Sequence, residues 1–288
     1  MGFEKCHPAV NFIFFAAAIL AGICFSHPVF IIEGLVASCI YYMKRRGLKG
    51  LKMLFAAILI GLLFAFFYSS YNHFGVTMLG KNFIGNNITL ESLLFSLSLG
   101  GRISCILMWL GCMHTIITTD KTIYLFGRIS PKFSLFLSIL IRMTPRVAGK
   151  GKQYNTARRC IGKGVCKDAG PRWILNFSKL FSAVTTWTIE AFTTISDSMR
   201  SRGSLLRKRT AFSIYRFDSR DRVLVLCMVV LMTIMFVGAF TGQATILYDP
   251  WIVIPTVTGS SYIFFAGYLI FCFVPLILDV ATEAAFKI

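Results

Sequence analysis

Long apolar runs, separated by short polar breaks, occupy both ends of the chain and leave a polar stretch between them. We expect six membrane spans, at about Ala9–Phe25, Val29–Met43, Met53–Tyr68, Leu93–Ile117, Val223–Phe240 and Ile263–Leu278. Several of these runs fall short of the roughly 20 residues that a perpendicular helix needs to cross a bilayer. The pattern therefore predicts an all-α, polytopic membrane protein with about six transmembrane helices. Because only Lys5 precedes the first run, we expect that run to be a retained span and not a cleaved signal.

Basic residues predict the orientation of these spans. The connection between the second and third spans, residues 44–52, is strongly basic, whereas residues 69–91 contain Lys81 as their one Lys or Arg. Cytoplasmic loops of membrane proteins carry an excess of Lys and Arg, so residues 44–52 are predicted to be cytoplasmic. The fourth span then returns Thr118 and the residues after it to the same side. Both termini are expected to be cytoplasmic.

The stretch from Arg142 to Arg222 carries most of the charge. It holds 18 of the 30 Lys and Arg residues and five acids, a net charge of +13 out of +18 for the chain. A sequence pI near 9.8 would be compatible with nucleic-acid binding. In a chain that is 56% hydrophobic, the cytoplasmic excess of Lys and Arg is the simpler explanation. We therefore expect membrane lipids among the partners, and no nucleic acid.

Two long helices are predicted inside this basic stretch. The first continues from the apolar Phe133–Ile141 to about Gly162, with Pro145 inside it as an expected kink. The second has Pro171 in its first turn and ends at Gly203, which gives about thirty residues, or roughly 45 Å. The second helix is amphipathic, with apolar residues spaced three and four apart at Phe177, Leu180, Phe181, Val184, Trp187, Ala191, Ile195 and Met199. Such a face beside a membrane requires an apolar partner.

Each helix ends in a basic tip, which we define as Ala157-Arg158-Arg159 and Ser201-Arg202-Gly203. A cation is favoured at the C-terminus of a helix, and a guanidinium there can bind a carboxylate of another protein through two parallel hydrogen bonds. The small residues beside these arginines would allow a tip to enter a groove. From the spacing alone, a polybasic surface that binds lipid head groups is the favoured interpretation.

Other chemistry is sparse in the sequence. There is no G-x-x-x-x-G-K-[ST] phosphate loop, so we expect no ATP binding by this chain. The four histidines show no pairing four residues apart, and we expect no metal site. The nine cysteines are predicted to be unpaired thiols. Glu33 and Arg102 are charges within or beside apolar runs, which marks them as functional candidates. For Arg102, which we place near the outer end of the fourth span, a snorkelling or structurally paired side chain is favoured.

Several segments together resemble a known family. They are Thr118–Thr122, Arg142–Arg146, Ala157–Arg159, Met199–Gly203, Lys208–Ser213 and Arg220-Asp221. In this order they are similar to the transmembrane T component of energy-coupling factor (ECF) vitamin transporters, over about residues 90–240. The Met-Arg-Ser-Arg-Gly and Lys-Arg-Thr-Ala-Phe runs are the most specific part. In that family two X-Arg-X motifs tip two long coupling helices, and the resemblance maps them to the two basic tips. Arg159 stands where the family usually has a small residue.

The resemblance implies a mechanism and a set of partners. Residues 157–159 and 201–203 would dock into grooves on two cytoplasmic ABC ATPases, identical or different, which bind the ATP and Mg²⁺. The apolar residues from Phe177 to Met199 would contact a small substrate-binding membrane subunit, the S component. This chain would be a non-catalytic coupling subunit without a cofactor of its own, in a bacterial plasma membrane, for uptake of a vitamin or micronutrient. Its expected parts are residues 1–117 with four spans, the coupling-helix module 118–222, and residues 223–288 with the last spans.

Two other functional classes remain open from the residues. A polytopic membrane enzyme acting on lipid-linked phosphates would need a cluster of acids with His or Cys, and the candidate acids are Asp197, Asp218 and Asp221. A self-contained channel or carrier would show polar or broken spans and inverted repeats, and we find no convincing internal repeat.

Overall fold

The computed structural model describes residues 2–72, 74–81, 85, 87–129, 131–165, 172–203, 215, 217–249, 251–256 and 258–286. Its elements are η1 (Phe3–Lys5), α1 (Pro8–Cys24), α2 (Pro28–Arg46), η2 (Gly47–Lys49), α3 (Gly50–Tyr71), β1 (Met78–Lys81), β2 (Asn87–Thr89), α4 (Leu90–Ile116), α5 (Thr119–Ile129), α6 (Pro131–Cys160), α7 (Arg172–Ser201), α8 (Ser219–Phe240) and α9 (Gly259–Phe286). Pro171 and the segment Lys208–Ser213, named above, lie outside the described residues, as do one of the four histidines, His73, and one of the nine cysteines, Cys166.

In the part of the chain that the structure describes, the architecture is all-α apart from one antiparallel pair of short strands, β1 and β2. Within the described ranges, four segments are long and apolar enough to cross a membrane, namely Pro28–Tyr71, Leu90–Ile116, Ser219–Phe240 and Gly259–Ala285. The first of these joins α2 to α3 through η2, while α1 is apolar but shorter. By length and composition the chain is therefore a multi-pass membrane protein with four candidate spans.

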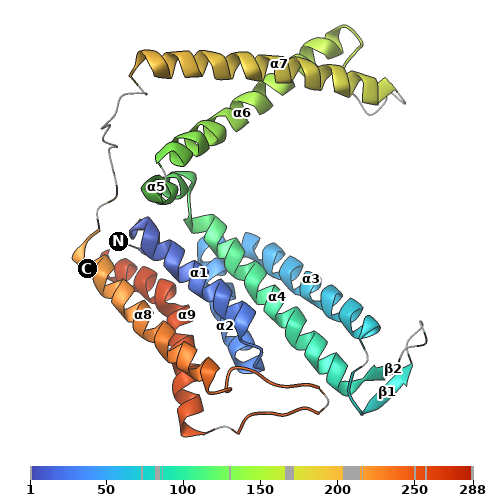
Figure 1. The fold of residues 1–288 in the computed structure, drawn as a ribbon, viewed down its shortest axis with the longest axis vertical. Helices are drawn as coiled ribbons and strands as arrows, with labels where there is room; N and C mark the ends of the chain where they lie inside the picture. The colour runs from blue at the N-terminus through green and yellow to red at the C-terminus, as the bar shows by residue number, and fades with distance from the viewer. Residues whose placement is uncertain are drawn as a thin grey trace. The chain divides into compact units, whose positions relative to one another are not determined.

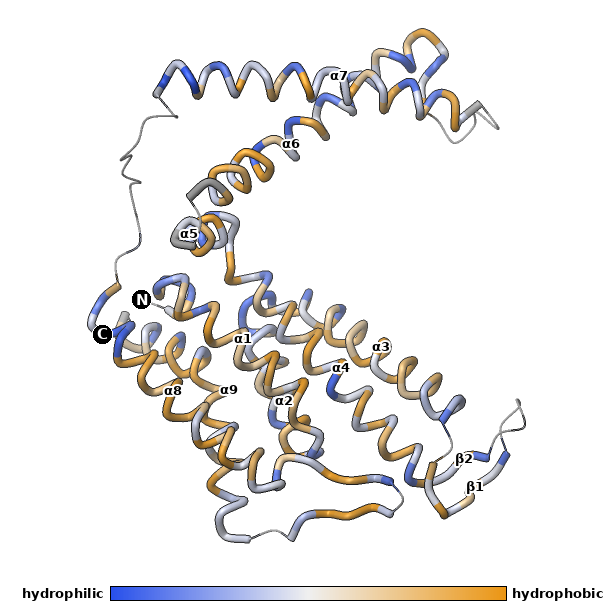
Figure 2. The backbone as a smooth tube through the Cα atoms, in the orientation of Figure 1, coloured by the Kyte–Doolittle hydropathy of each residue, from blue (hydrophilic) through white to orange (hydrophobic). Residues whose placement is uncertain are grey.

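The chain divides into two compact units. Unit 1 contains Met1–Lys121 and Tyr215–Ile288, and unit 2 contains Thr122–Ile214. Unit 1 is a helix bundle of α1–α4, α8 and α9, and unit 2 is built on α6 and α7 (Figure 1). The helices of unit 1 are strongly apolar along their length, whereas α7 alternates between apolar and polar positions (Figure 2).

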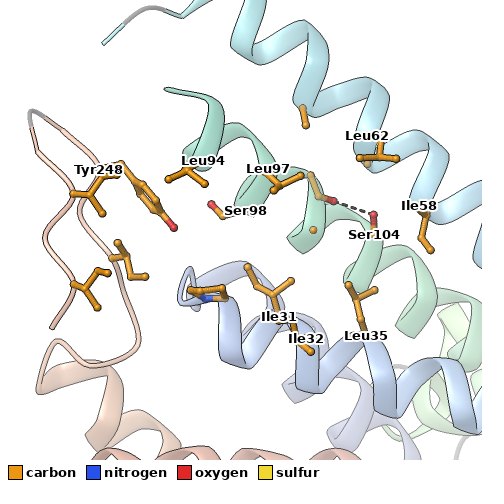
Figure 3. A pocket seen from close by; sticks show the side chains of 18 residues that line it. Ile31, Ile32, Leu35, Ile58, Leu62, Leu94, Leu97, Ser98, Ser104 and Tyr248 are labelled. Carbon is orange, nitrogen blue, oxygen red and sulfur yellow. Dashed lines mark hydrogen bonds between the residues drawn. The ribbon is translucent and has the colours of Figure 1, made fainter. Parts of the chain in front are cut away.

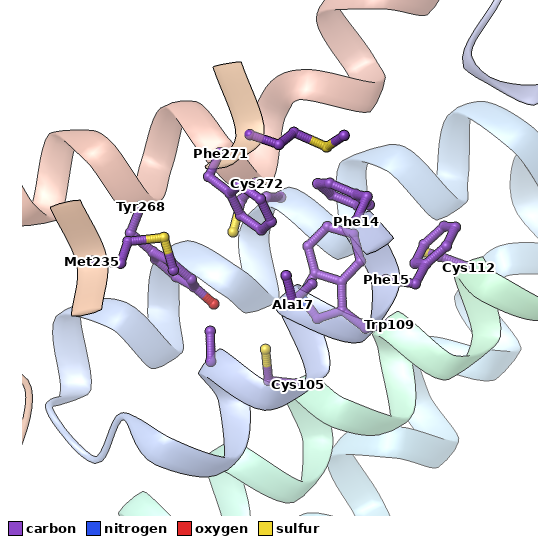
Figure 4. Packing of buried hydrophobic residues seen from close by; sticks show 14 of the residues in the cluster. Phe14, Phe15, Ala17, Cys105, Trp109, Cys112, Met235, Tyr268, Phe271 and Cys272 are labelled. Carbon is purple, nitrogen blue, oxygen red and sulfur yellow. The ribbon is translucent and has the colours of Figure 1, made fainter. Parts of the chain in front are cut away.

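Aromatic rings fill the centre of unit 1. Phe14 stacks on Phe271 with 5.0 Å between ring centroids and meets Trp109 edge-on at 5.5 Å, which joins α1, α9 and α4 (Figure 4). All three side chains are fully buried. Because water is absent from the bilayer core, this close packing and not the hydrophobic effect holds such helices together.

Small residues bring α3 and α4 into backbone contact. A Cβ atom on Gly61 would lie 2.4 Å from the carbonyl oxygen of Gly100, so neither glycine has room for a side chain. The Ser104 hydroxyl donates across the same interface to the Ala57 carbonyl oxygen at 3.0 Å. This is the small-residue interface typical of membrane helices.

Histidine and proline begin α1 and α2 in the same way. His7 and His27 are the N-cap residues of α1 and α2, and each is followed by proline at the first helical position. The Nδ1 atom of each ring accepts a backbone N–H two residues later, at 3.2 Å from Ala9 and 3.3 Å from Val29. Proline suits that position because its missing N–H would have no helical partner there.

One predicted boundary was wrong, and some elements were not predicted. The basic residues after Met43 are not an open loop, because α2 continues to Arg46 and only η2 separates it from α3. Lys and Arg are good helix formers and are favoured in the last turn, and Gly47, with φ +59°, reverses the chain. The α5 helix and the β1–β2 hairpin were not predicted as separate elements.

Candidate functional site

The first basic tip closes α6 with a glycine. Gly162 has φ +70°, its N–H donates to the Arg159 carbonyl oxygen at 3.0 Å, and the Lys163 N–H donates to that of Arg158 at 2.9 Å. These two bonds form a Schellman motif, which needs the left-handed conformation that glycine adopts freely. The predicted stop at Gly162 is confirmed, and α6 contains Pro145 within one continuous helix.

Side chains of α6 and α7 hold the chain that returns from this tip. The Val165 N–H donates to Asn155 Oδ1 at 2.8 Å, and Arg159 Nη2 donates to the Val165 carbonyl oxygen at 3.3 Å. From α7, Asn176 Nδ2 donates to the Gly164 carbonyl oxygen at 3.3 Å. The residues from Gly162 to Val165, called the return loop below, are therefore fixed to both helices.

The two arginines of the first tip make different contacts. Arg158 Nε donates to the Lys163 carbonyl oxygen at 3.3 Å, so in the described part of the chain its two Nη groups stay available for another acceptor. Arg159 instead uses one Nη group to brace the return loop. The neighbouring Ala157 is exposed and presents no side chain that would block access.

The second basic tip closes α7 in a similar way. Gly203 has φ +74°, and its N–H donates to the Arg200 carbonyl oxygen at 3.0 Å. Ser201 and Arg202 are exposed, and the Ser201 hydroxyl donates back to the Ser198 carbonyl oxygen at 2.9 Å. The predicted end of this helix at Gly203 is confirmed.

The two tips are not equivalent in helical position. Each terminating glycine bonds to the carbonyl oxygen three residues earlier, which belongs to Arg159 in the first tip and to Arg200 in the second. Arg158 and Arg202, the central residues of the two X-Arg-X segments, therefore occupy different positions of their helix ends.

The apolar residues predicted on α7 fall into two groups. Six are half-buried, namely Leu180, Val184, Trp187, Ala191, Ile195 and Met199. Trp187 lies beneath the Lys150 ammonium of α6 at 5.7 Å from the ring centroid, and Val184 lies close to Gly151 of the same helix. Phe177 and Phe181 are the exposed pair, with 48% and 64% of their surface accessible.

These two phenylalanines belong to an exposed aromatic row that the sequence interpretation included only in part. Trp173 stacks on Phe177 at 5.8 Å between ring centroids, and Phe177 stacks on Phe181 at 6.4 Å. Ile174 and Ile189 are also largely exposed on α7. The spacing of four residues from Trp173 to Phe181 was visible in the sequence and could have identified the row.

Arg102 has a structural contact in the bundle. It lies in the middle of α4, not near its outer end as predicted, because α4 extends from Leu90 to Ile116. Its Nη1 donates to the Ile23 carbonyl oxygen at 3.4 Å, one of the last carbonyls of α1. A cation is favoured at such a helix end, where carbonyls have no helical partner.

Glu33 keeps one buried carboxylate oxygen without a hydrogen bond among the described residues.

Unit 1 contains a groove of about 530 Å³. It lies between α2, α3, α4 and the chain after α8, with Ile31, Leu62, Leu97 and Tyr248 on its walls (Figure 3). The Ser104 hydroxyl near it is already bonded to backbone carbonyls. None of the described residues that line the groove has a charged side chain.

Metal and disulfide chemistry is not found in the described part of the chain. Among those residues, no cluster of three or more His, Cys, Asp or Glu side chains could hold a metal ion. The eight described cysteines are free thiols. Asp221, a candidate acid for an enzyme, accepts backbone N–H groups from His7 at 3.5 Å and Asp218 at 3.3 Å. Its carboxylate is thus committed to holding the start of α8.

Comparison of the chain with protein-family models and with curated proteins found no match in either.

Proposed function

We propose that this protein is the transmembrane coupling subunit of an ECF-type ABC importer. It transmits the ATP-driven motion of two ATPases to a separate substrate-binding membrane subunit that takes up a vitamin or micronutrient. The observation that carries the proposal is that α6 and α7, each 30 residues long, both end in a glycine-terminated tip with an arginine beside a small residue. A polybasic lipid-binding surface would not need two long helices with closed ends.

The docking contacts follow from the chemistry of the tips. Arg158 presents two Nη groups and Arg202 an exposed guanidinium, and each would bind a carboxylate in an ATPase groove. Ala157, Ser201 and Gly203 leave the space that a groove wall requires. Arg159 would support the first tip from behind and not enter the groove.

The exposed aromatic row of α7 supports a second, apolar partner. Trp173, Phe177 and Phe181 form a continuous stacked surface, larger than a single exposed side chain would give. Contact with the apolar helices of the S component would remove this surface from water. The half-buried apolar side chains from Leu180 to Met199 would extend this aromatic surface along α7, where α6 leaves them accessible.

The remaining parts of the proposal concern the membrane and the chemistry of transport. The protein would span a bacterial plasma membrane with α1–α4, α8 and α9, six spans in all, and with both termini in the cytoplasm. ATP and Mg²⁺ would be bound by the ATPases, and this subunit would carry no catalytic residue. Substrate selectivity would belong to the S component.

Co-purification tests the proposal most directly. Gently solubilised, tagged protein is expected to carry two nucleotide-binding subunits and one small hydrophobic subunit. The double variant Arg158→Glu, Arg202→Glu should lose the ATPases and substrate uptake while it still inserts into the membrane. Arg146→Glu makes one such charge reversal at an exposed position of α6 away from the tip and should retain both. Recovery of the ATPases with the double variant would refute the docking role.

A further inference from the structure

The N-terminal segment, residues Gly2–His7, is packed into one end of the helix bundle. Phe3 lies in the η1 turn and is fully buried, with its ring edge-on to Phe14 at 5.5 Å and to Phe15 at 6.2 Å. These contacts fix the segment to α1. Its backbone polar groups must therefore find partners inside the bundle.

Lys121, in the first turn of α5, connects this segment to the end of α4. Its Nζ is buried and donates to the carbonyl oxygens of Glu4 and of Ile116, the latter at 3.2 Å. In the amide orientation that satisfies both neighbours, Asn11 accepts from Lys121 Nζ at 2.9 Å and donates to the Phe3 carbonyl oxygen at 3.0 Å. Burial lowers the pKa of Lys121 below its ordinary value, and these three acceptors offset the cost of keeping the ammonium charged.

Asp221 connects the same segment to the start of α8. One carboxylate oxygen accepts the His7 N–H at 3.5 Å and the other accepts the Asp218 N–H at 3.3 Å. The His7 ring also meets Phe217 edge-on at 5.1 Å. The residues at which the chain re-enters unit 1 therefore pack against the N-terminal segment.

Ion pairs connect the segment to two more helices, α9 and α2. The Phe3 N–H donates to Asp279 Oδ1 at 2.7 Å, and Asp279 Oδ2 pairs with Arg45 Nη2 at 3.2 Å. Arg45 Nη1 pairs in turn with Glu4 Oε2 at 2.8 Å. Asp279 is almost fully buried, so this pairing is much less screened than a surface ion pair.

Two of these attachment points have a special place in the chain. Lys121 is the last residue of unit 1 before unit 2, and Asp221 follows closely after the chain returns at Tyr215. One short segment therefore holds both junctions through which unit 2 is connected to the bundle.

We propose that Lys121 and Asp221 are positioning residues that fix both junctions of unit 2 to the N-terminal segment. A displacement that arrives at either junction is then carried to α1, α2 and α9 as well. The inference concerns the bundle alone and does not depend on which partners unit 2 binds.

Hydrogen–deuterium exchange on the full-length protein in lipid nanodiscs tests this arrangement. Lys121→Met removes the ammonium and keeps the side-chain length. It should raise exchange about tenfold in residues 4–7 and also in residues 217–222, although the Lys121 hydrogen bonds go to Glu4, Ile116 and Asn11, because a lost hydrogen bond to a charged group weakens the segment that links the two regions. Lys121→Arg, which keeps the charge and the donors, should restore protection. Lys179→Met, on an exposed lysine of α7, should change neither region.

The reciprocal variant keeps the test decisive if Lys121→Met is not recovered from the membrane. Asp221→Asn preserves size and removes the charge, and should raise exchange near Lys121 as well as near His7. Faster exchange confined to the neighbourhood of each substituted residue would overturn the inference, because it would show two independent local contacts. Since the ATPases are absent from this experiment, its result is separate from the outcome of the docking test.

Discussion

The carboxamide of Asn155 accepts the backbone N–H of Val165, ten residues later in the chain, at 2.8 Å. Arg159, one turn further along α6, donates to the carbonyl oxygen of the same residue. Both polar groups of the Val165 backbone are thus held by side chains of the helix that has just ended. The first basic tip is therefore a closed structure and not a frayed helix end.

Loss of this contact should open the return loop. Asn155→Ala removes one hydrogen bond worth about 1 kcal/mol, which corresponds to roughly a fivefold larger open population. Trypsin cleavage after Lys163 in the purified protein should accelerate by that factor. Thr156→Ala, at the next position, which is exposed, removes only a local helix bond to the Lys152 carbonyl oxygen and serves as the control. Equal cleavage rates for Asn155→Ala and the wild type would show that the loop is held by other contacts.

The close approach of α3 and α4 gives a second prediction. In Gly61→Leu the new side chain would begin 2.4 Å from the Gly100 carbonyl oxygen, so the helices must separate. We expect a loss of about 3 kcal/mol in the free energy of unfolding, measured by denaturant titration in detergent micelles. Leu63→Phe enlarges an exposed side chain of the same helix and should be nearly neutral. A Gly61→Leu protein as stable as the wild type would mean that the helices are not packed through these glycines.

The fold of this chain could be predicted where one physical signal dominates. Apolar runs predicted the helices of unit 1, and two glycines, Gly162 and Gly203, predicted the ends of α6 and α7. Both glycines adopt the left-handed conformation in the structure. The predicted end of the second helix at Met43 was wrong because the charged residues after it were interpreted as a loop. Helix propensity does not penalise Lys or Arg, so α2 continued through them.

The candidate site was only partly accessible from the sequence. The composition of the basic tips was visible, but the bracing role of Arg159 depends on how the chain turns after Gly162. The polar contacts of the N-terminal segment could not be foreseen, since Phe3 and Asp279 are separated by almost the whole chain. Periodicity detects faces of single helices, and such long-range pairs have no periodic signal.

The proposed orientation can be tested with single cysteines. In a background without other cysteines, Cys160 lies at the exposed end of α6, on the side expected to be cytoplasmic. A membrane-impermeant maleimide should label it in inside-out vesicles and not in intact cells. Lys81→Cys, on the exposed β1 strand, should give the opposite result. Labelling of both positions from the same side would contradict the six-span arrangement.

Neighbouring residues of α7 separate packing within unit 2 from partner binding. Leu180 is half-buried, whereas Phe181 is 64% exposed and stacks on Phe177. Leu180→Ser should lower the stability of the protein by about 1 kcal/mol, because it removes apolar contact area. Phe181→Ser should leave the melting temperature unchanged, since its ring is mostly accessible. If the aromatic row binds the hydrophobic subunit, Phe181→Ser should nevertheless reduce co-purification of that subunit several-fold, while the ATPases remain bound through the tips. Full recovery of the hydrophobic subunit with Phe181→Ser and Phe177→Ser combined would exclude the aromatic row as its binding surface.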